Sequence, residues 1–221
     1  MRNEMMFRPV VNTDILEFMR FGQKPLTGIL KEIQDDARKR NVPVIPHETV
    51  AFLQFYLRSL QAKNILEVGT AIGFSASLMA TTLPKAHVTT IERYDMMAKE
   101  ANETFAKVGI TERVTLLEGQ AADLLPTLPK ESFDFIFMDS AKAKYVEFLP
   151  YCLELLTANG VLMIDDVFQA GTILKPIEEI PHKNHSIHRN LNKLFQTVHE
   201  DPKLASCMLP LGDGVLLVQK V

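Results

Sequence analysis

The spacing of apolar residues changes near Lys63, and this change divides the chain into two parts. Before it, apolar positions recur at helical spacing in three segments, Thr13–Phe21, Leu26–Arg40 and His47–Leu60. After it, short apolar runs alternate with further helical segments. We therefore predict a single domain, with an N-terminal helical cap over residues 1–62 and an α/β core over residues 63–221.

The apolar runs after Lys63 have the length and composition of strands that are buried on both faces. Five of these runs predict parallel strands: Asn64–Val68, His87–Ile91, Val114–Glu118, Phe133–Met138 and Val161–Ile164. The helices predicted among them are Ser75–Thr82, Tyr94–Val108 and Lys144–Leu156. Strands that alternate with helices are joined by right-handed crossovers, which gives a doubly wound sheet.

The alternation stops after these strands. Ala205–Leu209 and Val215–Val221 predict two further strands, and only the short segment Pro210–Gly214 joins them. A loop of this length makes a hairpin, so the last strand is antiparallel. We expect a Rossmann-like α/β fold with a mostly parallel seven-stranded sheet, an antiparallel last strand and N-terminal helices.

Composition narrows the class of protein further. The 221 residues are 47% hydrophobic and 23% charged, with a net charge of -3, which argues against a chain that coats nucleic acid nonspecifically. No apolar run approaches the roughly 20 residues of a membrane span, and Met1–Val11 lacks the apolar stretch of a signal peptide. Cys152 and Cys207 lack metal-ligand spacing. We expect a cytoplasmic protein with reduced cysteines and no membrane partner.

The run Asn64–Ser75 contains the strongest candidate binding motif. A strand leads into a glycine turn and a helix start, with the pattern E-x-G-x-x-x-G-x-S at Glu67, Gly69, Gly73 and Ser75. The two glycines would let the backbone approach a ligand without a Cβ in the way. Ala71 replaces the middle glycine of the dinucleotide fingerprint, and a carboxylate suits a cation better than a pyrophosphate. The pattern favours S-adenosylmethionine over NAD; the alternative is an ordinary strand-to-helix turn.

A second acidic residue follows at a suitable distance. Glu92 ends the second predicted strand, a little over 20 residues after the glycine turn, where an acidic residue typically binds the ribose hydroxyls of an adenosine. Alone, Glu92 would be interpreted as a solvated strand end. Together with the glycine turn it predicts an adenosine site.

Three carboxylates follow two other predicted strands. Asp139 follows Phe133–Met138, and Asp165 and Asp166 follow Val161–Ile164. The carboxyl ends of parallel strands face one crevice, so these side chains are expected to converge. Like charges in a small space favour a divalent cation, Mg²⁺ or Ca²⁺. The alternative is that Asp165 and Asp166 only cap the following turn.

Two cationic features accompany the acids. Lys142, three residues after Asp139, would act as a general base if a metal lies nearby. The alternative is a surface lysine at the start of a helix. The segment Lys175–Lys203 carries several lysine, arginine and histidine residues that could meet nucleic-acid phosphates. Three of its histidines, His182, His185 and His188, could form a metal tract. A solvated loop and helix is the alternative.

These motifs, in this order, resemble the metal-dependent class I O-methyltransferases, which include catechol and caffeoyl-CoA O-methyltransferases. The resemblance covers roughly Val42–Val221. Within that family, the chain looks most similar to the bacterial tRNA 5-hydroxyuridine methyltransferases, through I-L-E-x-G-T-A-I-G-F-S, the D-S-A-K segment and P-L-G-D-G-V.

The resemblance implies a role for each matching position. The cofactor would be lined by Ile45, Glu67, Gly69, Ser75, Glu92, Gln120, Ala121 and Asp139. The metal, most often Mg²⁺, would be held by Asp139, Asp165 and Asp166, with Lys142 as the base. The family usually has Asp-Asn where this chain has Asp165-Asp166, so the cation would be held more tightly but with less net positive charge.

Three functions follow as expectations. The first is methylation of 5-hydroxyuridine at the tRNA wobble position, because that base presents two adjacent oxygens to a metal. The second is methylation of a small catechol or phenol, which presents the same pair. The third is a non-catalytic adenosine-binding protein, which the coexistence of Lys142 with three acids disfavours. The resemblance also implies a homodimer.

Overall fold

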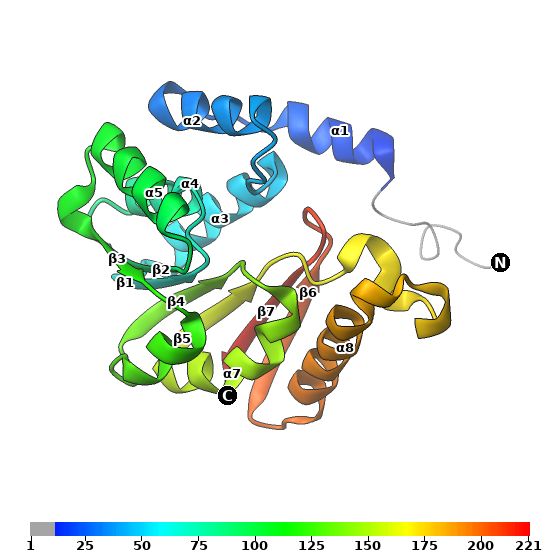
Figure 1. Cartoon of the computed structure of the whole chain (residues 1–221). Helices are drawn as coiled ribbons and strands as arrows, with labels where there is room; N and C mark the ends of the chain where they lie inside the picture. Colours follow the sequence, from blue (N-terminus) through cyan, green and yellow to red (C-terminus); the bar gives the residue numbers. More distant parts are fainter. Residues whose placement is uncertain (1–11) are drawn as a thin grey trace.

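The computed structural model describes residues 12–221 and shows one seven-stranded sheet with helices on both faces (Figure 1). The strands are β1 (Asn64–Val68), β2 (His87–Glu92), β3 (Val114–Glu118), β4 (Phe133–Met138), β5 (Leu156–Ile164), β6 (Leu204–Leu209) and β7 (Val215–Lys220). Their order across the sheet is β3-β2-β1-β4-β5-β7-β6. The order reverses beside β1, and in such sheets ligands bind at this switch point.

The directions of the strands confirm the predicted fold class. β1 to β5 pair in parallel, and β7 is antiparallel to both of its neighbours, β5 and β6. β7 is therefore the one strand of the described sheet that runs against the others, as the short hairpin loop predicted. β5 begins at Leu156, five residues before the predicted start, and otherwise the strand bounds agree within one residue.

Eight α-helices lie around this sheet in residues 12–221. They are α1 (Thr13–Gly22), α2 (Gly28–Lys39), α3 (His47–Leu60), α4 (Phe74–Thr82), α5 (Asp95–Val108), α6 (Ala121–Leu124), α7 (Tyr145–Leu155) and α8 (His185–Glu200). The six predicted helices are present within about two residues at each end, and α6 and α8 had no predicted bounds. No helix in this part of the chain combines the length and the apolar character needed to cross a bilayer.

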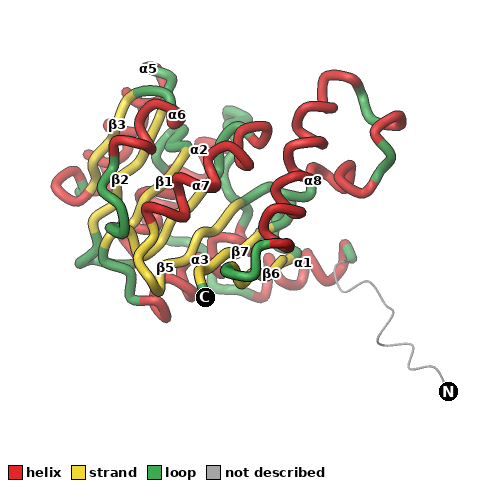
Figure 2. The backbone as a smooth tube through the Cα atoms, turned by 90° about the horizontal axis from the view of Figure 1, so that it is seen from below, coloured by secondary structure: helices red, strands yellow, loops and turns green. Residues whose placement is uncertain are grey.

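Successive side chains of the central strands point alternately into two hydrophobic cores, one on each face of the sheet. Ile65, Phe135 and Phe137 face the core that α3, α4 and α5 cover, whereas Leu66 and Ile136 face the core beneath α7 and α8. Figure 2, seen from below, shows α7 and α8 on the near side of the sheet. Burial on both faces explains why these strands are continuous apolar runs. It also holds the carboxyl ends of the strands, where the candidate residues lie, in fixed positions.

α1 is attached to the core through α3, whereas α2 packs directly against α4 and α5. α1 buries none of its side chains, but its Arg20 donates two hydrogen bonds of 2.8 Å to the carboxylate of Glu48 on α3. Burial would raise the pKa of Glu48, yet the Arg20 guanidinium lowers it overall. The division into a cap and a core stays a prediction, and residues 1–11 of the predicted cap lie outside the described residues.

Candidate functional site

The turn after β1 needs glycine because of contacts within the protein. Gly69 has a φ of +105°, and a Cβ placed there would lie 2.0 Å from the carbonyl oxygen of Asp139. Gly73 has a φ of +79°, and its Cβ would lie 2.7 Å from the ring of Phe105. Neighbouring protein atoms therefore already require glycine at both positions, and the close approach of a ligand to this backbone stays a prediction.

Glu67 lies fully buried beneath this turn. Thr90 on β2 donates a hydrogen bond of 2.5 Å to its Oε2, while its Oε1 has no hydrogen-bond partner in residues 12–221. Burial raises the pKa of Glu67 to about 8, and the hydroxyls of Ser75 and Thr90 oppose this rise. A carboxyl group held in this way gains most from a cationic neighbour.

Glu92 at the end of β2 ties the turn to the next strand. Its Oε2 accepts a hydrogen bond of 2.9 Å from the backbone N–H of Ala71, and its Oε1 accepts from those of Arg93 at 2.8 Å and Tyr94 at 3.0 Å. This carboxylate is 7% exposed and borders a cavity. These hydrogen bonds therefore hold the Glu92 carboxylate in place at the cavity wall, and its binding of a ribose stays a prediction.

Two neighbouring cavities at the carboxyl ends of the strands bring most of the predicted residues together. The larger has a volume of about 690 Å³ and the smaller about 320 Å³, and both are lined by Pro43, Gly69 and Asp139. Of the other candidates, the larger is lined by Glu92, Gln120 and Ala121, and the smaller by Ile45, Ser75, Lys142, Asp165 and Asp166. Glu67 is the one predicted residue that lines neither, because it is buried under the turn.

The predicted carboxylates lie beside one another because β4 and β5 are adjacent. Asp165 is 2% exposed, and burial together with the repulsion of Asp139 and Asp166 raises its pKa to about 8. Burial and the charge of Asp166 likewise raise the pKa of Asp139 to about 6. This local excess of negative charge is what a cation would relieve.

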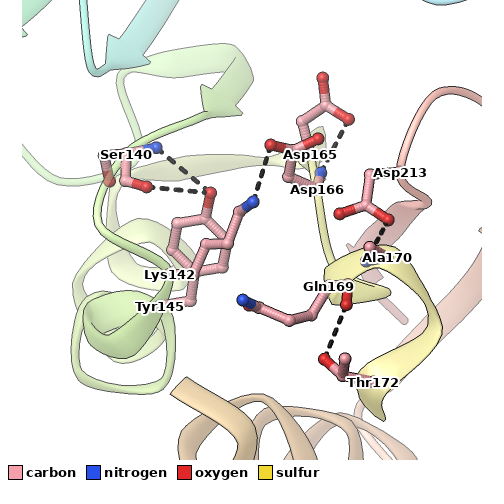
Figure 3. Close-up of polar contacts among 9 residues, drawn as sticks. All are labelled: Ser140, Lys142, Tyr145, Asp165, Asp166, Gln169, Ala170, Thr172 and Asp213. Atoms are coloured by element: carbon pink, nitrogen blue, oxygen red, sulfur yellow. Dashed lines mark hydrogen bonds and ion pairs between the residues drawn. The ribbon is translucent and has the colours of Figure 1, made fainter. Parts of the chain in front are cut away.

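Lys142 supplies part of that relief. Its Nζ lies 2.8 Å from Oδ2 of Asp166 in the pair drawn in Figure 3, and Oδ1 of Asp165 accepts a hydrogen bond of 2.8 Å from the Asp166 N–H. In residues 12–221, no three His, Cys, Asp or Glu side chains are already gathered as metal ligands. The three carboxylates therefore share one cavity wall, and their common metal ion stays a prediction.

The loops that carry these groups are held by residues that the sequence did not reveal. The buried Tyr145 hydroxyl accepts a hydrogen bond of 3.2 Å from the N–H of Ser140 and donates one of 3.4 Å to its carbonyl, which fixes the loop between Asp139 and Lys142. In the loop after Asp166, Ala170 donates a hydrogen bond of 2.7 Å to Asp213 in the β6–β7 turn (Figure 3). The P-L-G-D-G-V motif was a signal for this second support, whereas nothing in the sequence marked Tyr145.

Two of the three histidines of the possible metal tract contact backbone carbonyl groups. His185 Nε2 lies 2.9 Å from the carbonyl of Ile180, and His188 Nε2 lies 3.1 Å from that of Lys175. The possible metal tract is therefore not formed among the described residues. The segment also contains nearly as many acids as lysines and arginines, the acids being Glu178, Glu179, Glu200 and Asp201. It is a loop and the amphipathic helix α8, with little excess of positive charge.

The sequence and the fold of this chain are similar to those of known O-methyltransferases. Residues 23–221 match the O-methyltransferase family. A caffeoyl-CoA O-methyltransferase of Eucalyptus globulus is 27% identical over 94% of this chain and 87% of its own. A catechol O-methyltransferase of Niastella koreensis is 37% identical over 56% of this chain and 58% of its own. The SAH-bound methyltransferase PaMTH1 of Podospora anserina superimposes with a TM-score of 0.85 at 26% identity, covering 100% of this chain and 97% of its own.

Proposed function

Because the chain belongs to the O-methyltransferase family, we propose that it transfers the methyl group of S-adenosylmethionine to a hydroxyl oxygen of an acceptor. The observation that carries this proposal is the sharing of Asp139 between two cavities, one bordered by Glu92 and the other by Lys142 and the remaining acids. The donor and the acceptor would then meet at Asp139. The SAH bound to PaMTH1, a chain of the same fold, supports the choice of cofactor.

The larger cavity would take the adenosine part of the cofactor. Glu92 would accept from the ribose hydroxyls, and Gln120 and Ala121 would border the base, since all three line this cavity. The amino-acid part would extend past Gly69 towards Ser75, with Ile45 covering it from the N-terminal side. Glu67 would act from beneath the turn, through its charge.

Replacing the buried carboxyl of Glu67 should change the stability of the protein and its affinity for the cofactor in opposite directions. Its pKa of about 8 lies above the ordinary 4.5, so the folded protein binds this proton more tightly than the unfolded chain. Its contribution to the free energy of unfolding therefore falls as the pH rises from about 4.5 to about 8. Glu67→Gln should remove this pH-dependent loss of stability, which amounts to at most about 5 kcal/mol in urea unfolding without cofactor. The same substitution should weaken S-adenosylmethionine binding about tenfold in calorimetry. Glu118→Gln, an exposed carboxylate at the end of β3, should change neither.

We propose that Asp139, Asp165 and Asp166 hold a divalent cation, most often Mg²⁺. Their mutually repelling oxygens fit a hard cation, because they form an oxygen-rich donor set and are compensated only in part by Lys142. When bound, such an ion acts as a Lewis acid that favours ionisation of a coordinated hydroxyl. Asp166 adopts a φ of +59°, a left-handed conformation that Asp and Asn tolerate better than most residues, which accommodates either residue at this position.

Lys142 is the proposed general base. In its neutral form the Nζ lone pair would take the proton of the acceptor hydroxyl, the oxygen would form a bond to the methyl carbon, and the carbon–sulfur bond would break to release S-adenosylhomocysteine. Lys142→Met should lower kcat about 10²-fold and leave cofactor affinity unchanged. Lys130→Met removes an exposed lysine that pairs with Glu154 and should keep full activity. Equal kcat values for the two variants would assign the proton transfer to another group.

For the acceptor we propose 5-hydroxyuridine at the tRNA wobble position. The 5-hydroxyl and the neighbouring 4-carbonyl would both reach the carboxylate side of the smaller cavity. A small catechol is the second candidate, favoured by the identity with the Niastella koreensis enzyme. The homodimer and the cytoplasmic location remain predictions.

Salt dependence separates these two acceptors. Methylation of hydroxyuridine-containing tRNA should fall steeply in kcat/KM between 50 and 200 mM salt, because phosphate contacts release counterions, whereas a neutral catechol should show little change. The measurement is transfer of a radiolabelled methyl group to each acceptor over this range. Efficient, salt-insensitive catechol turnover without a tRNA product would select the small-molecule acceptor.

A further inference from the structure

A third cavity of about 600 Å³ lies between the N-terminal helices and the segment that precedes α3. Every polar side chain that lines it can donate a hydrogen bond, and no acidic residue lines it among residues 12–221. These donors are Arg20, Lys31, Gln34, Arg38 and His47. Its volume lies in the range of ligand pockets, and a lining that offers several donors and no carboxylate suits an anionic group that accepts hydrogen bonds.

The pairing of these donors shows which of them remain available. Arg20 is bound to Glu48 and Lys31 to Asp35, but Arg38 makes no ion pair within residues 12–221. Gln34 is 2% exposed, and its Nε2 has no hydrogen-bond partner in that range. His47 Nε2 is likewise buried without a partner there. Buried polar groups are nearly always satisfied, so these two nitrogens are available to an acceptor that enters the cavity.

The remaining wall is apolar and partly aromatic. Phe21, Pro25 and Leu26 line it, and the Phe21 side chain is 87% exposed. A ligand that matches both walls carries an anionic, acceptor-only group attached to a flat ring. A nucleotide has this combination, because its phosphate accepts hydrogen bonds and its base stacks on aromatic or apolar side chains.

The position of this cavity connects it with the candidate active site. Pro43, Val44 and Pro46 line it on one side and line the smaller active-site cavity on the other. A polymeric acceptor with one unit beside Lys142 would therefore have its neighbouring units close to this wall. The segment Lys175–Lys203, by contrast, has four acids for its five lysines and arginines, in two pairs near its ends.

We propose that this cavity binds a nucleotide of the RNA acceptor adjacent to the methylated uridine. Arg38 and Gln34 would bind the phosphate, and the base would lie against Phe21 and Pro25. This inference rests on the proposed RNA acceptor, and it places a binding site in the N-terminal helices, which the sequence did not suggest.

The test uses uridine 5′-monophosphate as the probe and the full chain saturated with S-adenosylhomocysteine, so that the cofactor cavity is filled. Titration calorimetry should show millimolar or tighter binding to the wild type. Arg38→Gln should weaken it about tenfold and should raise KM for tRNA while kcat is retained. Lys39→Gln removes the same charge from the next, exposed position of α2, outside the cavity lining, and should leave both values unchanged.

The outcomes separate this inference from the proposed function. Arg38-dependent nucleotide binding without any methylated RNA would overturn the RNA acceptor. Methylated RNA without nucleotide binding, or with equal losses for the two variants, would overturn the cavity as a nucleotide site. Gln34→Leu provides a second check, because it keeps the size of the side chain, removes the buried donor and should also weaken binding of the probe.

Discussion

Removal of divalent cations with excess EDTA is expected to stop methyl transfer, and added Mg²⁺ is expected to restore it. Asp165 is buried and Asp139 is half-buried beside Asp166, and desolvation and the neighbouring carboxylates raise the pKa of both Asp139 and Asp165. A cation that such a site holds supplies several kcal/mol of stabilisation to a developing oxyanion. Its loss should therefore lower kcat by roughly 10³-fold. Radiolabelled methyl transfer measures this directly.

A thermal measurement checks the same site without turnover. Mg²⁺ should raise the melting temperature of the wild type, because a ligand that binds only the folded state stabilises it. Asp139→Asn should abolish both the rise and the activity, and Glu118→Gln should preserve both, since Glu118 is exposed and outside the two active-site cavities. Full activity in excess EDTA, with no effect of Mg²⁺ on melting, would rule out the catalytic cation.

Gly69→Ala is expected to be the most destabilising of the conservative single substitutions in the glycine turn. The added Cβ would lie 2.0 Å from the Asp139 carbonyl oxygen, a backbone atom that cannot move away without displacing the end of β4. The φ of +105° adds strain for any residue with a Cβ. A loss of about 4 kcal/mol in urea unfolding is expected. The displacement would also move Asp139, so activity should fall with stability.

The matched control is Gly109→Ala. Gly109 has a φ of +75° at the end of α5, and nothing lies within 4 Å of the position of its Cβ. It therefore carries the conformational strain without the collision, and a loss of about 1 kcal/mol is expected. Similar losses for the two variants would show that conformational strain alone explains the requirement for glycine at position 69.

The fold was largely predictable, because its central strands are buried on both faces and most of its helices are amphipathic. The five parallel strands and the antiparallel final strand could be inferred from short-range pattern alone. The start of β5 at Leu156 was not predicted, since Thr157–Gly160 has no run of apolar residues. α8 also had no predicted bounds, because its sequence is rich in histidine and asparagine and its mean hydropathy is low.

The candidate site was predictable in part. Strand ends located Glu92, Asp139 and Asp165, because parallel strands present their carboxyl ends at one edge of a sheet. The reason for Gly69 was not predictable, since the atom that excludes a Cβ belongs to Asp139, far away in the chain. The support from Tyr145 and the cavity beside Arg38 likewise depend on tertiary contacts that no local pattern records.

The place of β7 in the sheet has a consequence for the order of folding. β7 follows β6 along the chain but lies between β5 and β6, so the β6–β7 hairpin joins the sheet only when β7 pairs with the distant β5. The turn between them brings Gly212 against Pro46 and Gly214 against Phe168, next to the walls of the smaller cavity. Pairing of such distant segments is slow. A chain whose central strands have paired would therefore still lack a complete site, and affinity for the cofactor should appear only with the last step of folding.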